Sequence, residues 1–242
     1  MAAIKVLKQE LRNSIKASSK QIETSEVSRQ SNLIHHRLLS MPEYHGAKNI
    51  GIYLSMPSGE VMTKSIVLDA LRNGKTVFVP YIYKPLAPNG PASMMDMVSL
   101  FSEEDFESLP QDRWGIPTPS KSSLARRQSY FGKVSGRHIC GKGGKLDVIL
   151  MPGVAFDKGR RRLGHGKGYY DVFLSQYHNQ AKSEQPLETS GGQVESHTKY
   201  KMPLLVALAL QQQLLPEENI VPTDSTDWQV DMIITGDGSV IS

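Results

Sequence analysis

The residues best suited to chemistry lie in a basic, glycine-rich segment near the middle of the chain. Its cations and glycines are Arg160, Arg161, Arg162, Gly164, Gly166, Lys167 and Gly168. Alternating glycines let several backbone N–H groups point into one concavity, and uncompensated cations beside them attract an anion. Val172, Phe173 and Leu174 then begin an apolar helical face, so the loop would lie at a helix N-terminus, which favours phosphate. We predict a phosphate-binding loop here, although on glycines alone an ordinary tight turn is equally well supported.

Two well-known phosphate-binding loops do not fit this spacing. Gly159 and Gly164 have the separation of a Walker A loop, but His165 and Gly166 stand where lysine and serine or threonine are required. The later glycines are spaced two and two, whereas the dinucleotide fingerprint needs two and three. The segment therefore predicts an anion site of another kind.

Two acidic residues are candidates for magnesium ligands. Asp171 follows the glycine loop within one helical turn, and Asp227 lies in the loop before the last apolar segment. Magnesium beside a nucleotide prefers a few carboxylates together with waters and phosphate oxygens. From spacing alone, a solvated loop acid is the better-supported interpretation of either residue.

The first twenty residues predict a helix with two stripes. Ile4, Leu7, Leu11 and Ile15 recur at helical spacing and predict an inward-facing apolar stripe over residues 3–20. A basic stripe of the same period contains Lys5, Lys8, Arg12 and Lys16. By pattern alone the basic stripe is a solvated helix face.

The rest of the chain alternates short apolar segments with helical ones. We predict a helix after Ser25 that Pro42 ends, a strand over 49–55, a helix capped by Thr63 that stops at Gly74, and a strand over 76–80. Further strands are expected over 94–101, 147–151, 204–210 and 231–235. The alternation predicts an α/β fold, a three-layer α/β/α sandwich around a mostly parallel sheet, formed by residues 1–242 as a single domain. The polar stretches 120–145 and 179–201 are expected to be surface loops without chemistry.

Composition narrows the class of protein without choosing a ligand. The chain has 242 residues, a net charge of +4 and a pI near 9.0, which suits an anionic small molecule or a nucleic acid. Its single cysteine, Cys140, predicts a reducing compartment, and the absence of a long apolar run predicts no membrane span. We expect a cytoplasmic protein, with a mitochondrial transit peptide as the alternative interpretation of the Lys- and Ser-rich N-terminus.

At these residues the sequence resembles the 5-formyltetrahydrofolate cyclo-ligase (methenyltetrahydrofolate synthetase) family. The most specific segments are Pro152-Gly153-Val154-Ala155-Phe156-Asp157 and Arg162-Leu163-Gly164-His165-Gly166-Lys167-Gly168-Tyr169-Tyr170-Asp171. Supporting segments in the family order are Lys8-x-x-Leu11-Arg12, Tyr53-Leu54-Ser55-Met56-Pro57, Gly59-Glu60-Val61, Trp114-Gly115-Ile116-Pro117 and Asp227-x-x-Val230-Asp231. The chain departs from many bacterial members at Thr118, where they carry glutamate, and in the length of the two polar stretches.

The resemblance implies ATP-dependent cyclisation of 5-formyltetrahydrofolate to 5,10-methenyltetrahydrofolate. It implies that ATP is held by Lys8, Arg12, Arg162, Leu163, Gly164, His165, Gly166, Lys167, Gly168, Tyr169 and Tyr170. It implies that the folate, which could carry a polyglutamate tail, contacts Leu54, Glu60, His165, Gly166, Lys167, Gly168 and Tyr169. Asp171 and Asp227 would hold Mg²⁺. Lys8, Arg162 and Lys167 would stabilise the transferring phosphoryl group.

Other interpretations remain open at this point. A different α/β enzyme could use the loop for a sugar phosphate without ATP, and the basic pI allows a nucleic-acid binder. Thinly spread charge without an aromatic-interleaved motif argues against nucleic acid. We expect a monomer with a small-molecule substrate and no nucleic-acid or membrane partner.

Overall fold

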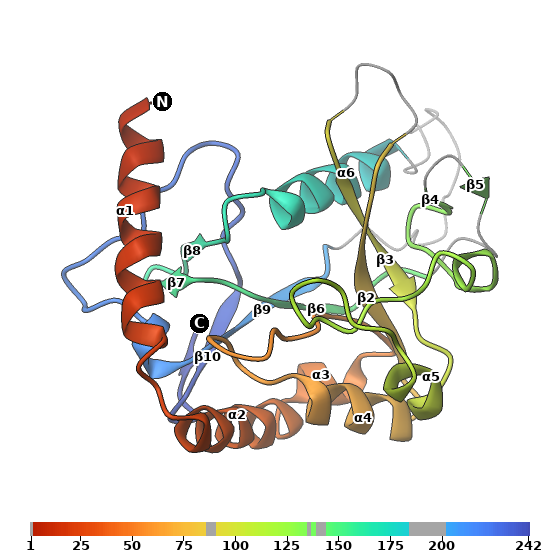
Figure 1. Cartoon of the computed structure of the whole chain (residues 1–242), viewed down its shortest axis with the longest axis horizontal. Coiled ribbons are helices and arrows are strands. Elements are labelled where there is room, and N and C mark those ends of the chain that lie inside the picture. Colours follow the sequence, from red (N-terminus) through yellow and green to blue (C-terminus); the bar gives the residue numbers. More distant parts are fainter. Residues whose placement is uncertain (1, 86–90, 135–136, 139–143, 184–201) are drawn as a thin grey trace, which may run out of the picture.

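The computed structural model describes residues 2–85, 91–134, 137–138, 144–183 and 202–242 (Figure 1). The helices are α1 (Ala2–Ser19), α2 (Thr24–Leu39), α3 (Pro42–Gly46), α4 (Lys64–Arg72), α5 (Glu103–Glu107) and α6 (Tyr169–Ser183). The strands are β1 (Asn49–Ile52), β2 (Thr76–Tyr83), β3 (Met94–Ser99), β4 (Lys133–Val134), β5 (Arg137–His138), β6 (Val148–Met151), β7 (Ala155–Phe156), β8 (Arg162–Leu163), β9 (Leu204–Ala209), β10 (Met232–Thr235) and β11 (Val240–Ile241). Short 3₁₀ turns occupy Leu124–Arg126 and Gln211–Gln213.

A seven-stranded sheet in the order β11-β10-β9-β6-β1-β2-β3 forms the centre of the molecule. The five strands from β10 to β2 are parallel to their neighbours, as the strand–helix alternation predicts. Both edge strands, β3 and β11, are antiparallel. Residues 84–93 connect β2 to β3, which is shorter than a crossover connection needs, so β3 returns beside β2 as an antiparallel partner. The prediction of an α/β fold around a mostly parallel sheet is confirmed.

Alternation along the central strands separates two apolar cores, one on each face of the sheet. Val148 and Leu150 of β6 lie in the core under α2, α3 and α4, whereas Ile149 and Met151 pack toward α6. The side chains on both faces of β6 are buried, which explains why its sequence is a continuous apolar run. The three layers are visible in Figure 1, with α2, α3 and α4 on one side of the sheet and α6 on the other.

Helix α1 packs outside these two cores. Leu11 and Ile15 contact a small third cluster formed by Ala155, Leu163, Leu215 and Val221, around the β7–β8 hairpin. The prediction that Leu7 also faces inward is wrong, because its side chain is 51% exposed. α1 therefore covers the hairpin that leads into the glycine loop, and its first turns protrude beyond it (Figure 1).

Two local predictions also need correction. Thr63 precedes α4, but its hydroxyl donates to the carbonyl of Tyr53 (2.7 Å) and makes no helix-capping bond. The strand expected over 49–55 ends at Ile52, and Thr63 Oγ1 instead accepts from the amide of Ser55 (3.2 Å). Thr63 thus fixes the chain where it leaves the sheet toward the site described below.

The polar stretch 120–145 is not simply a surface loop. Arg127 is 1% exposed and donates twice to the carboxylate of Asp105, at 2.6 Å each. Ser129 is buried and hydrogen-bonds the buried carboxylate of Asp96, and Tyr130 stacks on Tyr177 of α6 with ring centroids 4.1 Å apart. These residues cover the β3 end of the sheet.

Parts of the predicted insertions lie outside the described residues, namely 135–136, 139–143 (with Cys140) and 184–201. Residues 179–183 belong to the end of α6, which extends the helix into the stretch expected to be a loop.

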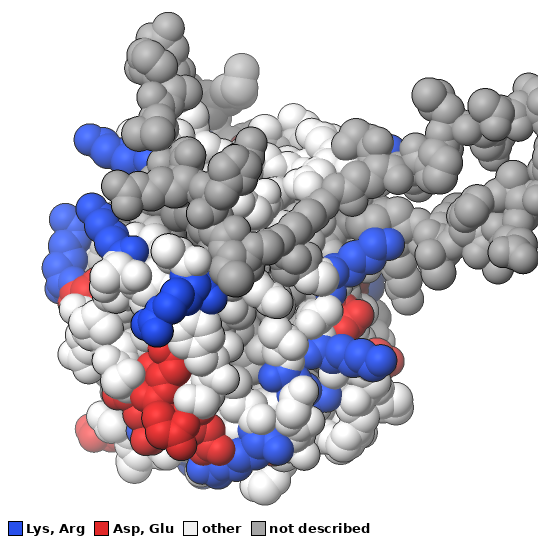
Figure 2. All heavy atoms as spheres, turned by 90° about the vertical axis from the view of Figure 1, so that its right-hand side faces the viewer, with Lys and Arg blue, Asp and Glu red and all other residues white. Residues whose placement is uncertain are grey.

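Charges of both signs are interspersed over the face at the β3 and α5 end (Figure 2). Helix α5 contributes Glu103, Glu104, Asp105 and Glu107, and Arg72 and Lys64 of α4 pair with Glu103 and Glu107. Among the described residues, no helix has the length and apolar character required to cross a bilayer.

Candidate active site

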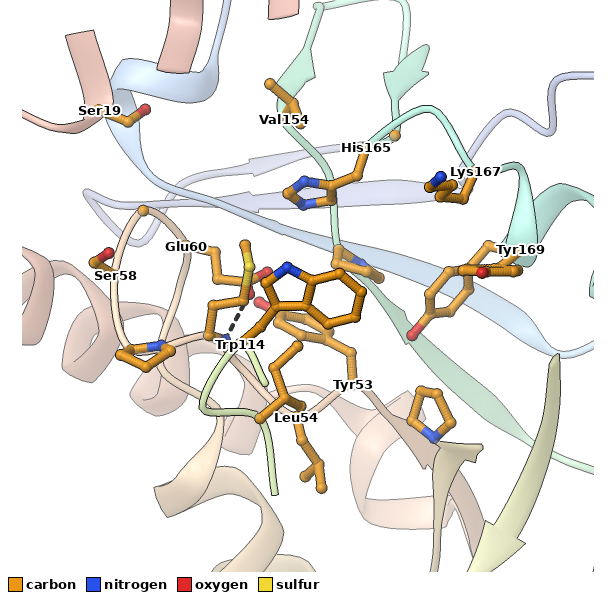
Figure 3. Close-up of a pocket in the computed structure, with 18 of the residues that line it drawn as sticks. Ser19, Tyr53, Leu54, Ser58, Glu60, Trp114, Val154, His165, Lys167 and Tyr169 are labelled. Carbon is orange, nitrogen blue, oxygen red and sulfur yellow. Dashed lines mark hydrogen bonds between the residues drawn. The ribbon is translucent and has the colours of Figure 1, made fainter. Parts of the chain in front are cut away.

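A cavity of about 1220 Å³ opens at the carboxyl ends of β1 and β6, where parallel α/β sheets usually bind ligands (Figure 3). β1 leads to Tyr53 and Leu54, and β6 leads to Pro152 and the β7–β8 hairpin. Single small-molecule sites are usually about 300–1,000 Å³, so this cavity has room for two ligands side by side.

The structure brings most of the predicted site residues to this cavity. Those lining it are Leu54, Glu60, Arg162, Gly164, His165, Lys167, Gly168, Tyr169, Tyr170 and Asp171. The predicted residues that do not line it are Lys8, Arg12, Leu163, Gly166 and Asp227. Leu163 is 1% exposed and packs in the cluster under α1, so its side chain supports the loop from behind.

The glycine loop has a backbone that requires glycine. Gly166 and Gly168 have φ of 96° and 68°, in the left-handed region that is costly for residues with a Cβ atom. α6 begins at Tyr169 directly after the loop, so its unpaired N–H groups lie beside these residues. The predicted loop at a helix N-terminus is therefore present, and its geometry suits an anion.

Arg12 holds the loop from the side of α1. Its Nε donates to the carbonyl of Gly164 (2.8 Å), and a Cβ atom on Gly166 would lie 3.3 Å from the Arg12 guanidinium carbon. The arginine thus links α1 to two successive glycines of the loop, with part of the guanidinium left beside the loop for a ligand.

The expectation that the loop arginines are uncompensated is wrong for two of them. Arg161 Nε pairs with the buried carboxylate of Asp157 at 2.6 Å, and Arg162 Nη2 pairs with Asp171 Oδ1 at 2.7 Å. Arg160, whose φ is 63°, donates to the carbonyl of Asp231 (2.9 Å). These bonds tie the hairpin to neighbouring loops, so most of the arginine cluster is structural.

Lys167 differs from these arginines. It is exposed, lines the cavity, and has no acidic partner within 4 Å among the described residues. Lys167 is therefore the loop cation best able to meet an anionic ligand without first breaking an ion pair.

Lys8 of α1 is held between two aspartates. Its Nζ donates to Asp224 Oδ2 (2.8 Å) and Asp227 Oδ2 (2.6 Å), and the side chain is 11% exposed. Burial works to lower the pKa of Lys8, but its bonds to the two carboxylates leave the pKa raised overall. Lys8 is thus a fixed, charged ammonium group rather than a member of a solvated helix face.

The two predicted metal ligands are close together through Trp228. The amide of Trp228 donates to Asp171 Oδ1 (3.1 Å), and Asp227 is the preceding residue. Each carboxylate uses one oxygen for its cation, Arg162 or Lys8, and within the described part of the chain Asp171 Oδ2 and Asp227 Oδ1 have no hydrogen-bond donor. No group of three or more His, Cys, Asp or Glu side chains suited to a metal occurs among those residues. Two carboxylate oxygens fit Mg²⁺ that takes its other ligands from water and phosphate.

Glu60 is a buried carboxyl group in the cavity wall. It is 5% exposed, and its Oε1 accepts a hydrogen bond from the amide of Met56 (2.7 Å), drawn as a dashed line in Figure 3. Burial raises the pKa of Glu60 to about 7, and the Met56 bond only partly offsets that rise. Near neutral pH the group can therefore accept or donate a hydrogen bond to a polar ring.

Four tyrosine and tryptophan side chains line the cavity, and one of them, Tyr53, is buried and donates its hydroxyl hydrogen bond to the carbonyl of Val61 (3.1 Å). Trp114 is 54% exposed and its indole projects into the space between Leu54, His165 and Tyr169 (Figure 3). The Tyr169 hydroxyl hydrogen-bonds Ser93 Oγ (2.8 Å), whereas the buried Tyr170 hydroxyl has no partner among the described residues. Trp114 and Tyr169 are the flat surfaces available to a ring.

Sequence reasoning missed two features of this region. Asp224 carries no motif, and only the fold shows that it completes the Lys8 clamp. Lys16 continues the basic stripe of α1, and that period was the signal that could have placed it on the cavity with Lys20.

The chain is similar to known proteins over nearly its whole length. A model of the 5-formyltetrahydrofolate cyclo-ligase family matches residues 4–236. The chain belongs to this family. A probable 5-formyltetrahydrofolate cyclo-ligase of Caenorhabditis elegans is 33% identical over 234 residues, covering 97% of this chain and 95% of the relative. The mouse 5-formyltetrahydrofolate cyclo-ligase is 31% identical over 240 residues, covering 98% of each.

The fold agrees with that of a solved structure. The 5,10-methenyltetrahydrofolate synthetase of Aquifex aeolicus superposes with a TM-score of 0.62 at 24% identity, covering 97% of this chain and 91% of that one. Family membership indicates cyclo-ligase activity in folate metabolism.

Proposed function

We propose that this chain converts 5-formyltetrahydrofolate to 5,10-methenyltetrahydrofolate with ATP as the phosphoryl donor. The observation that carries the proposal is the glycine loop at the start of α6, in the wall of a cavity large enough for two ligands, with Lys167 unpaired among the described residues. The loop's N–H groups and Lys167 suit the ATP phosphates, and Leu54, Glu60 and Trp114 suit the pterin on the facing wall.

The chemical problem is the formyl oxygen on N5. Because the formyl group is an amide, its oxygen is too poor a leaving group for N10 to displace. Attack of that oxygen on the γ-phosphorus forms an O–P bond, releases ADP and leaves an iminium-like phosphate. N10 then attacks the formyl carbon and loses its proton, and the C–O bond breaks to release phosphate. The ring closes as 5,10-methenyltetrahydrofolate, and the formyl oxygen departs with the phosphate.

The protein's own contribution is positioning and charge. Arg162 is fixed by Asp171 with its guanidinium in the cavity wall, and Lys167 can move to the transferring group because no ion pair within the described part of the chain holds it. Arg12 contacts the loop from α1, and Lys8 of the same helix is held by Asp224 and Asp227; both would add positive charge for the phosphate oxygens. Asp171 and Asp227 would hold Mg²⁺, which supplies charge neutralisation at the phosphate oxygens. Such a site stabilises in-line transfer mainly by orientation and electrostatics.

Glu60, Tyr169, Trp114 and His165 would form the hydrogen-bonding and stacking wall for the folate. Glu60, with a pKa of about 7, could pair with the amino and ring N–H groups of the pterin, and Tyr169 or Trp114 could stack on it. His165 faces the cavity, and burial followed by the charges of Lys16, Arg162 and Arg12 lowers its pKa, which favours a neutral imidazole that hydrogen-bonds a ligand.

A turnover assay tests the proposal. Purified protein mixed with 5-formyltetrahydrofolate, Mg²⁺ and ATP should develop the methenyl absorbance, and omission of ATP should abolish it. No absorbance change with folded protein would refute the assignment. We also propose a monomeric, cytoplasmic enzyme, with a mitochondrial share as the alternative that cell fractionation would decide.

A further inference from the structure

The cavity has a second end that the phosphate chemistry does not use. Ser19 and Ser58 lie on the opposite side of Trp114 from Lys167 and Tyr169 (Figure 3). The end near Ser19 is formed by the last turns of α1 and the start of α2. Its lining includes Lys16, Lys20, Ile22, Thr24, Val27 and Met62.

Two lysines give this end an uncompensated positive charge. Lys16 and Lys20 are four residues apart, and the amide of Lys20 still donates to the carbonyl of Lys16 (3.3 Å), so their side chains leave the same face of α1. Both are exposed, and neither has an acidic partner within 4 Å among the described residues. By contrast, Lys8, Arg161 and Arg162 are all ion-paired. Two neighbouring like charges at a cavity rim favour an anionic ligand.

The other side chains at this end are apolar. Val27 is buried and belongs to the core under α2, Ile22 packs against it, and Met62 is 43% exposed. An apolar floor beneath two ammonium groups suits a ligand with a hydrophobic ring followed by carboxylates.

We infer that Lys16 and Lys20 bind the glutamyl carboxylates of the folate substrate. The inference rests on the proposed function. In 5-formyltetrahydrofolate, N5 and N10 must reach the phosphate loop, while the aminobenzoyl ring leads away to a glutamate with two carboxylates. Ser19, the residue before Lys20, lies across Trp114 from Lys167 (Figure 3), whereas Lys16 is near enough to His165 for its charge to lower the pKa of that imidazole. Ammonium groups one helical turn apart match the two carboxylates. Additional glutamyl residues would continue past Lys20 into solvent.

The test measures binding directly, by isothermal titration calorimetry. The ligands are 5-formyltetrahydrofolate, 5-formyltetrahydropteroate (which lacks the glutamyl residue) and Mg-ATP. In the Lys16→Gln/Lys20→Gln variant we expect Kd for 5-formyltetrahydrofolate to rise about fivefold, while Kd for the pteroate and for Mg-ATP stays unchanged. Added salt should weaken folate binding by the unaltered protein more than binding by the variant.

A Lys5→Gln variant is the matched control. Lys5 is an exposed lysine of the same helix that does not line the cavity, so its loss removes one charge without touching this end. It should bind all three ligands as the unaltered protein does.

Each alternative outcome has a distinct meaning. An unchanged Kd for 5-formyltetrahydrofolate in the double variant would overturn the inference. A rise in Kd for Mg-ATP instead would assign the lysines to the nucleotide and overturn it too. If the unaltered protein bound neither folate compound, the proposed function itself would fail, whereas equal Kd values for the two compounds would reject only the glutamyl site.

Discussion

Replacing Glu60 by glutamine should change how the stability of the protein depends on pH. The carboxyl group is 5% exposed, and its folded-state pKa of about 7 lies above the ordinary value of 4.5. Between these two values the folded state holds a proton that the unfolded state has lost. The free energy of unfolding therefore falls as pH rises through this range.

The size of the effect follows from the two pKa values. A difference of about 2.5 pKa units is worth roughly 3 kcal/mol in total, of which about 2 to 3 kcal/mol appears between pH 5 and pH 8. Glu60→Gln keeps the shape and the acceptor for the Met56 amide but cannot ionise. The variant should thus gain stability relative to the unaltered protein as pH rises.

Urea unfolding of both proteins at pH 5, 6, 7 and 8 measures this difference. Asp96, a second buried carboxyl whose pKa burial raises to about 6, contributes a similar slope to both proteins and cancels in the comparison. A difference in unfolding free energy that stays constant over this range would refute the assignment of a raised pKa to Glu60.

Four further changes test other parts of the structure. Asp171→Ala should abolish turnover and also lower the free energy of unfolding by about 3 kcal/mol in urea titrations, because it leaves the buried Arg162 unpaired; unchanged stability would contradict the pair. Lys167→Ala should raise KM for ATP about tenfold without moving the unfolding midpoint, and an unaltered KM would count against its phosphate role. Gly168→Ala should cost about 1 kcal/mol from its positive φ and weaken ATP binding measured by calorimetry; normal affinity would show that the loop tolerates the change. Arg127→Met should lower stability by about 3 kcal/mol while both KM values stay normal, and a raised KM would link that region to the site.

Most of the fold was predictable because its signals are local. Continuous apolar runs such as Val148–Met151 mark strands buried on both faces, and the helices between strands imply parallel pairing. The burial of Arg127 and Ser129 was not predictable, since their partners Asp105 and Asp96 are more than twenty residues away and only the folded chain brings them together.

The glycine loop of the candidate site was predictable, but the ion pairs around it were not. The glycine loop and the acidic residue after it follow from spacing, and the structure places them together at the end of β6. The sequence could not show that Arg161 and Arg162 are ion-paired while Lys167 has no acidic partner in the described ranges, because each pairing depends on side chains that the fold brings within reach. Asp224 was missed for the same reason, since its partner Lys8 lies at the other end of the chain.

Transfer of the formyl oxygen to phosphate is the step that tests the proposed chemistry most directly. 5-Formyltetrahydrofolate labelled with ¹⁸O in the formyl group would be turned over with unlabelled ATP, and the released phosphate analysed by mass spectrometry. The proposed route predicts one ¹⁸O atom in each phosphate released with the methenyl product. Unlabelled phosphate, with the label recovered in water, would contradict activation of the formyl oxygen by phosphorylation in this cavity.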